Sequence, residues 1–187
     1  MSINRLLELH DLAKQVTRKY ERKRFLFPQL MRDTGKHFTG IRGARGTGKT
    51  VLLRQYALEH DDAFYLSADT LDRDDDAWGL IQKLNQHYKF RTFLLDEVHF
   101  LPDPTALLKR LYDFVDVRIL FSSSVALAMQ ASAHDLSRRV RLMNLHGFSF
   151  REYLAFTQGI SLPALELEQI VESQWEPDHL RSGRFFD

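Results

Sequence analysis

Apolar residues recur along this chain at two different spacings. Residues 3–20 carry them at the three- and four-residue spacing of a helix, which predicts an amphipathic helix packed on a domain. Further on, short apolar runs indicate strands, and stretches with helical spacing separate them. The expected strands are 37–42, 63–67, 91–97, 117–121 and 140–145, and the expected helices are 51–59, 76–88, 104–114 and 125–136. This alternation predicts an α/β fold, with a mainly parallel sheet covered by helices on both faces.

Two parts of the pattern stand apart. The first expected strand is the weakest, because His37, Thr39 and Gly40 are poor core residues. The C-terminal segment shows helix signals without strands. Ser149 to Glu152 form a capping box that predicts a helix ending near Gly159. We expect a second helix over 162–175, with Ser161 as its cap and Pro163 in its first turn.

Composition excludes several classes of protein. Of 187 residues 44% are apolar, enough for a folded domain, and the net charge of +1 gives no overall attraction to nucleic acid or membrane. The absence of cysteine excludes disulfides and thiolate metal sites and suits a reducing compartment, so we expect a cytoplasmic protein. The N-terminus has no signal-peptide core, and no apolar stretch is long enough to span a membrane.

Residues 43–50 read GARGTGKT, which fits the phosphate-loop pattern GxxxxGK[ST]. Glycines let such a loop turn its backbone N–H groups toward a phosphate chain, the lysine adds a positive charge, and the threonine hydroxyl can bind Mg²⁺. A glycine-rich turn before a helix is the plain alternative. The preceding strand and the following helix favour the phosphate loop. The predicted contact residues are Gly43, Ala44, Arg45, Gly46, Thr47, Gly48, Lys49, Thr50 and Val51.

An acidic pair supplies the second half of this predicted site. Asp96 and Glu97 follow four apolar residues at the end of the expected third strand. We expect Asp96, with Thr50, to hold Mg²⁺, and Glu97 to polarise an attacking water. Polar residues at a strand end before a turn are the alternative, and the upstream loop favours the catalytic interpretation.

Four further features have two interpretations each. Ser122, Ser123 and Ser124 follow the fourth strand, and one of them, Ser123 in our assignment, either faces the γ-phosphate or serves as a helix cap. Arg138 and Arg139 either act on a neighbouring subunit's nucleotide or lie on the surface.

The basic run 18–24 is either a solvated helix end or a contact to nucleotide or nucleic acid. The acidic run 72–76 either binds a metal or occupies a helix's first turn, which we favour.

These motifs occur in an order that resembles a known family. GARGTGKT is followed by FLLDEVHFLPD at 93–103, ILFSSS at 119–124 and LSRRVRLMNLHGFSFREYL at 136–154. Together they resemble the prokaryotic AAA+-like P-loop ATPases that carry a C-terminal domain of poorly understood role. Two positions depart from that family, since Ser122 and Arg138 stand where glycine is usual.

The resemblance implies a sheet with strand order 5-1-4-3-2, in which the 117–121 strand separates the phosphate-loop strand from the acidic one. It implies ATP and ADP as nucleotides, and Arg139 as an arginine that reaches a neighbour's nucleotide in a homo-oligomer. It also implies that these residues are the ATPase half of a longer protein or a natural truncation. We therefore expect an N-terminal helix at 1–24, an ATPase core at 25–147 and a small helical segment at 148–187.

Two other functions stay open. The domain could be a nucleotide-controlled binding module, with a protein or nucleic-acid partner and negligible turnover. It could also be a small-molecule kinase, although Glu97 argues against this because activating water is a disadvantage for a kinase.

Overall fold

The computed structural model describes residues 1–33, 35–72, 74–123, 136 and 138–171. The chain forms two compact units, Met1–Gly147 and Phe148–Asp187. The expected helix at 125–136 lies outside the described residues, apart from Leu136.

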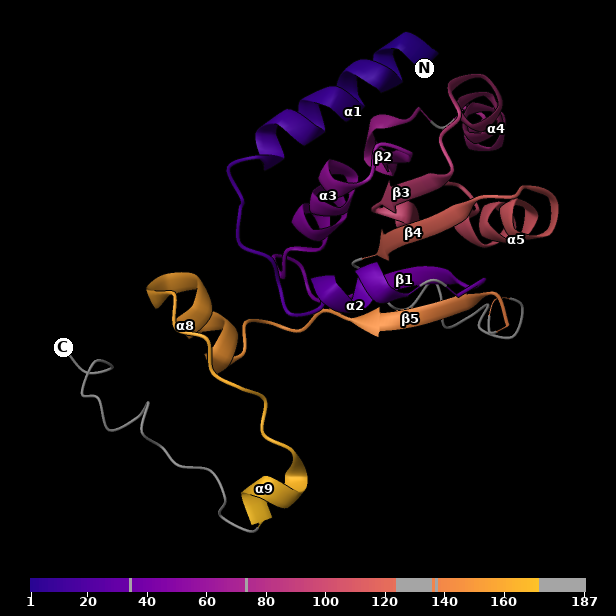
Figure 1. Ribbon diagram of the computed structural model, residues 1–187. Coiled ribbons are helices and arrows are strands. Elements are labelled where there is room, and N and C mark those ends of the chain that lie inside the picture. Colours follow the sequence, from indigo (N-terminus) through magenta and orange to yellow (C-terminus); the bar gives the residue numbers. More distant parts are fainter. Residues whose placement is uncertain (34, 73, 124–135, 137, 172–187) are drawn as a thin grey trace. The chain divides into compact units, whose positions relative to one another are not determined.

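Unit 1 is built around a five-stranded sheet in which every pairing is parallel (Figure 1). The strands lie in the order β2-β3-β4-β1-β5, which confirms the predicted topology, with β4 between the phosphate-loop strand and the acidic strand. Their bounds are β1 Phe38–Arg42, β2 Ala63–Ser67, β3 Thr92–Asp96, β4 Arg118–Ser123 and β5 Val140–Asn144.

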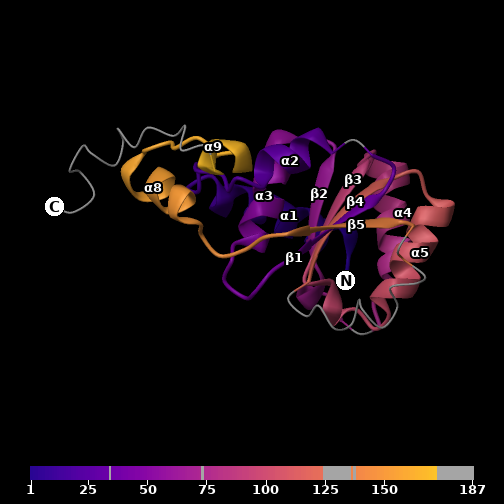
Figure 2. The same ribbon diagram turned by 90° about the horizontal axis from the view of Figure 1, so that it is seen from below.

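Helices cover both faces of this sheet, as the alternating pattern predicted. Figure 2 shows α2 and α3 on one side of the strands and α4 and α5 on the other. The N-terminal helix α1 contacts β2 and α3. The helices are α1 Ile3–Thr17, α2 Phe27–Arg32, α3 Lys49–Glu59, α4 Ala77–Tyr88 and α5 Pro104–Phe114, with short 3-10 turns at η1 Ala68–Thr70 and η2 Val98–Phe100.

The core is divided by the sheet into two halves. Successive strand residues point to opposite faces, so Phe93 and Leu95 pack toward α4 and α5 while Leu94 packs toward α3. Because both faces are buried, β3 and β4 carry continuous apolar runs rather than alternating ones.

The strand that looked weakest from sequence, β1, is nevertheless a central strand. Thr39 is buried and its hydroxyl donates to Asp33 Oδ2 at 3.0 Å. Gly40 leaves room for its neighbours, since a Cβ there would lie 2.6 Å from Leu142 Cδ2 and 2.7 Å from the Phe121 ring. The small residue is required by packing from both adjacent strands, which local hydrophobicity does not record.

Among the differences from the sequence expectations, three bear on how the chain packs. The first helix ends at Thr17 rather than residue 20, and the segment that follows it is bound to α3 by Gln55. The side-chain amide of Gln55 donates to the carbonyls of Tyr20 and Arg22 at 2.7 and 3.0 Å. The acidic run is not in a helix's first turn, since α4 begins only at Ala77, and Asp75 instead pairs with the Met1 amino group.

The third difference lies in unit 2. Helix α8, Phe150–Gln158, begins at the predicted capping box and ends at Gly159, whose φ is 70°. The next helix, α9, begins only at Leu167 and is described to Val171, so the expected start at Leu162 is wrong. Pro163 disfavours helical dihedrals at Leu162, whose carbonyl instead accepts from the Arg151 guanidinium at 2.7 and 3.0 Å.

We predict that Gly40→Ala lowers the free energy of unfolding by about 1–3 kcal/mol, because the added methyl group overpacks the contact with Phe121. Urea denaturation followed by circular dichroism measures the change. Gly147→Ala is the matched control, since a Cβ there meets no atom within 4 Å. Equal free energies of unfolding for the two variants would show that the packing around Gly40 accommodates an added methyl group.

Candidate functional site

The predicted loop, the acidic pair and the β4 serines lie at one edge of the sheet. Because all strands are parallel, their carboxyl ends share an edge, which is where open α/β sheets bind ligands. The glycine-rich loop leaves β1 there. Asp96 ends β3, and Ser123 ends β4. The loop and the acidic pair lie on either side of the β4 end.

The loop at 43–48 has the backbone conformation that its glycines allow. Gly46 and Gly48 have φ of 83° and 95°, a region that side chains disfavour. At Gly43 the requirement is space, since a Cβ would lie 2.3 Å from the Leu145 carbonyl oxygen. Helix α3 begins at Lys49, directly after Gly48 in its N-cap position. Backbone N–H groups and the positive end of a helix dipole therefore meet at this loop, as in anion-binding sites.

Lys49 is buried, with 4% of its surface exposed. Its ammonium group donates to the carbonyls of Gly43 and Ala44 at 2.9 and 3.0 Å. The Thr47 hydroxyl also donates to Ala44 O, at 2.9 Å. These contacts hold the loop closed over the lysine, so its charge is positioned within the loop before any phosphate arrives. Thr50, one residue on, is half-buried in the first turn of α3.

Asp96 is the most buried acidic group of the site, with 1% of its surface exposed. Its Oδ2 accepts from the Tyr65 hydroxyl at 2.7 Å, and its Oδ1 accepts from the Ser122 hydroxyl. Burial, and then the neighbouring Asp96 charge, raise the pKa of Tyr65, so the phenol stays protonated and donates to the carboxylate. Two hydroxyls therefore fix the orientation of the carboxylate.

Glu97 adopts a left-handed backbone conformation, with φ of 52°. This is uncommon for a residue with a side chain and is found often at functional sites. Its N–H donates to the Ser122 hydroxyl oxygen at 3.1 Å. Its Oε2 lies 3.2 Å from His99 Nδ1, on the following turn η2. The two adjacent acidic residues are thus directed apart, with Asp96 buried and Glu97 partly exposed.

The two described serines of β4 have different surroundings. Ser122 is fully buried and joins Asp96 to the Glu97 backbone. Ser123 instead lines a cavity of about 370 Å³ together with Ala44 and Thr47 of the loop. Because successive side chains of a strand point to opposite faces, the two adjacent serines contact different groups. Ser124 lies outside the described residues.

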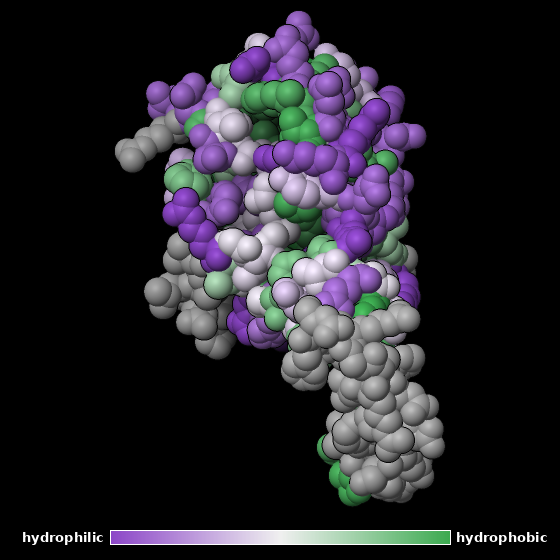
Figure 3. Space-filling view, turned by 90° about the vertical axis from the view of Figure 1, so that its left-hand side faces the viewer, coloured by the Kyte–Doolittle hydropathy of each residue, from purple (hydrophilic) through white to green (hydrophobic). Residues whose placement is uncertain are grey.

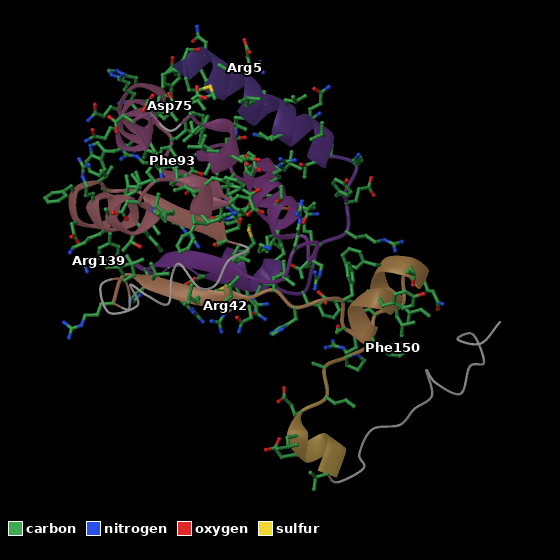
Figure 4. The ribbon with its side chains drawn as sticks, turned by 180° about the vertical axis from the view of Figure 1, so that it is seen from behind. Arg5, Arg42, Asp75, Phe93, Arg139 and Phe150 are labelled. Atoms are coloured by element: carbon green, nitrogen blue, oxygen red, sulfur yellow. The ribbon has the colours of Figure 1, made fainter. Side chains whose placement is uncertain are left out.

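Arg139 lies at the other edge of the sheet, because it precedes β5 rather than following it (Figure 4). Its guanidinium forms a two-point ion pair with Asp113 of α5, at 3.0 and 3.1 Å. The structure therefore does not bring it to the loop of its own chain, and its predicted role toward a neighbouring chain stays a prediction. Arg138 is exposed.

Sequence reasoning missed three residues of this edge. Tyr65 lies in the middle of β2, where an aromatic residue signals only a strand. Arg42 and Asn144 pair where β1 and β5 end and line the same cavity as Ser123 (Figure 4). No local pattern distinguishes them, since parallel pairing of distant segments creates the contact.

Of the two interpretations of the basic run 18–24, a solvated helix end fits the exposed residues of the run but does not fit Arg24. It is buried, and its guanidinium donates to Thr47 of the loop. Its position at the end of a basic run is the only sequence feature that could have indicated this contact. The run alone does not show which of its arginines is buried.

The residues present fit a magnesium ion. Among the described residues no group of three or more His, Cys, Asp or Glu side chains could hold a metal. Thr50 and Asp96, the predicted ligands, would offer only two protein side chains, which suits Mg²⁺ because it keeps several water ligands. Each Asp96 oxygen accepts one hydroxyl and retains a lone pair for such a water.

The AAA domain family profile (AAA_14) matches residues 35–154. This span contains the phosphate loop, the acidic pair, both described serines of β4 and Arg139. The chain belongs to the AAA domain family. Within the described part of this AAA domain, no helix has the length and apolar character needed to cross a membrane.

Comparisons with single proteins agree with this assignment. An uncharacterized protein of Methanocaldococcus jannaschii, MJ1637, is 31% identical over 173 residues, which cover 82% of this chain and 36% of that protein. The chain therefore spans about a third of that relative's length.

Two solved structures share the fold. The Walker-type ATPase PABY2304 of Pyrococcus abyssi has a TM-score of 0.53 and 15% identity, over 80% of this chain and 62% of that one. The Hsp104–ADP complex of S. cerevisiae has a TM-score of 0.54 and 16% identity, over 71% of this chain and 23% of that one.

We predict that Tyr65→Phe lowers the free energy of unfolding at neutral pH by about 1–3 kcal/mol, because it leaves a buried Asp96 oxygen without its donor. Tyr88→Phe, at an exposed tyrosine, is the matched control. Urea denaturation from pH 7 to 11 measures both.

The pH dependence has a definite sign. Folding raises the pKa of Tyr65 above its ordinary value of 10.0, so its stabilising contribution is complete below pH 10 and declines above it, as the unfolded chain ionises. The gap between wild type and Tyr65→Phe should therefore narrow above about pH 10. A gap that is constant or widens with pH would contradict the bond to Asp96.

Proposed function

We propose that this chain binds ATP with Mg²⁺ and hydrolyses it slowly. One observation carries the proposal. A buried lysine, Lys49, lies within a glycine-rich loop, and the acidic pair Asp96 and Glu97 lies on the other side of the end of β4. Family membership supports a P-loop ATPase. Binding and turnover by this chain are the proposed part.

Each residue has a proposed role in binding. The N–H groups of residues 43–51 would surround the phosphates, and Lys49 would neutralise their charge. Lys49 Nζ now contacts two loop carbonyls, so it is already directed along the loop. Thr50 and Asp96 would hold Mg²⁺, which supplies charge neutralisation for the transferring phosphoryl group. The choice of adenine over guanine rests on the family alone.

Hydrolysis needs a base beside the phosphate. Glu97 is partly exposed, and its unusual backbone conformation directs it away from the buried Asp96. We assign it to orient and deprotonate the attacking water. Ser123 is the serine assigned to the γ-phosphate, because it lines the same cavity as the loop.

One observation favours a second candidate function, a nucleotide-controlled switch with negligible turnover. The Glu97 carboxylate lies 3.2 Å from His99 Nδ1, so a side chain of its own chain lies beside the proposed base. If this contact persists with ATP bound, chemistry is slow and the output is a conformation.

We predict that Glu97→Gln retains ATP binding and loses about 10²–10⁴-fold in turnover, because the amide has nearly the same size but cannot accept the proton of water. Phosphate release in steady state and calorimetric titration of ATP measure the two effects. Lys49→Ala is the companion variant, and it should lose tight binding itself.

The outcomes separate the alternatives. Unchanged turnover in Glu97→Gln would assign the base to another residue. Negligible phosphate release by the wild type, with tight ATP binding, would favour the switch. Phosphate transferred to an added acceptor would indicate a kinase.

We predict that Arg139 acts on the nucleotide of a neighbouring chain, so that turnover depends on protein concentration. In an oligomer whose sites need a neighbour's arginine, turnover per chain rises with protein concentration, and Arg139→Ala removes the rise while ATP affinity stays the same. The loss in rate should approach ~10³-fold. Asp113→Asn, which removes only the in-chain ion partner, is the control. A rate independent of concentration and unchanged in Arg139→Ala would make the arginine structural.

A further inference from the structure

The segment between α1 and α2 carries a buried arginine to the phosphate loop. Arg24 is 6% exposed, although it ends a run of otherwise exposed basic residues. Its Nη1 donates to Thr47 O at 2.5 Å. Its Nη2 donates to His146 O at 2.7 Å and to Gly147 O at 3.2 Å. One planar group therefore joins the loop after β1 to the segment after β5.

The position of this arginine is itself fixed. Gln55, buried in α3, holds the preceding backbone through the carbonyls of Tyr20 and Arg22. The carbonyls of His146 and Gly147 hold the far side of the guanidinium. An arginine with five donors in a rigid plane can satisfy such a divergent set of acceptors, whereas a lysine cannot keep the same geometry.

The contact to Thr47 has a consequence for the next residue. In a planar trans peptide the C=O and the following N–H point in opposite directions, and no cis peptide occurs in the described chain. Holding the Thr47 carbonyl toward Arg24 therefore directs the Gly48 N–H away from it. Gly48 has a φ of 95°, which a glycine can keep or abandon at low cost, so a hydrogen bond to the preceding carbonyl favours one orientation of the peptide.

We propose that Arg24 is a positioning residue of the phosphate loop, which fixes the Thr47–Gly48 peptide so that the Gly48 N–H faces the bound phosphates. It does not touch the nucleotide and acts through the loop backbone. This inference rests on the proposed function, since it requires a phosphate ligand in the loop.

The proposal specifies which ligands are affected. A defect in the loop weakens every ligand that places a phosphate chain there and leaves the rest of the nucleotide's contacts intact. Arg24→Lys should therefore weaken ATP, ADP and inorganic pyrophosphate by a common factor of roughly 10- to 100-fold, the effect of losing a charge-assisted hydrogen bond. AMP, measured by competition, should change little.

Calorimetric titration of the full chain with Mg²⁺ present tests this, together with urea denaturation of each variant. Arg18→Lys, at an exposed arginine of the same run, is the matched control and should bind all four ligands as the wild type does. Wild-type affinity for ADP and pyrophosphate in a folded Arg24→Lys variant overturns the proposal, and so does an equal loss for AMP. A wild-type chain that binds none of the ligands overturns the proposed function as well, which distinguishes the two failures.

Hydrogen exchange on the wild type decides the matter if Arg24→Lys does not fold. Pyrophosphate should then protect the backbone of 46–48 and of 146–147 together, because one guanidinium joins them. Protection confined to the loop overturns the proposal.

Discussion

The insertion of β4 between the phosphate-loop strand and the acidic strand is the constraint on which the rest of the site depends. It separates Lys49 from Asp96 and leaves the end of a strand between them. Adjacent residues of that strand then serve different purposes, because their side chains alternate in direction. Ser122 fastens the acidic pair from within the core, and Ser123 reaches the cavity beside the loop. A site with the two strands paired directly would have no position for either serine.

Three charged side chains at this edge are almost fully buried, and each is held by hydrogen bonds of the protein itself. Lys49 and Arg24 donate to backbone carbonyls, while Asp96 accepts from two hydroxyls. Burying a charge is unfavourable unless such partners are present. Under the proposed function, these charges would need little reorganisation on binding a phosphate and its metal, which is the property that electrostatic catalysis requires. Glu97 differs because it is partly exposed and touches His99, so it can change partners.

The segment from Arg18 to Arg24 shows how one residue of a basic run makes specific contacts that the others do not. Most of its side chains are exposed, and such residues mainly keep a protein soluble. Gln55 of α3 donates to two backbone carbonyls of the run. Arg24, at the end of the run, then lies between the phosphate loop and the segment that follows β5. The helix that periodicity extends to residue 20 ends at Thr17, before the part of the run that Gln55 binds.

The sequence alone determined the elements whose energetics are local. Short apolar runs predicted the strands. GARGTGKT predicted the loop and the helix that follows it, and Ser149 with Glu152 predicted the start of α8. The order of the strands followed from the resemblance to a family rather than from any pattern of residues. Tertiary structure alone decided the position of Gly40 in a central strand, the bond from Tyr65 to Asp96, the burial of Arg24 and the late start of α9. These features depend on contacts between segments far apart in the chain or on competition for a carbonyl. Periodicity and propensity record only what a residue's near neighbours in sequence impose, so they carry no information about which distant group a buried donor will find.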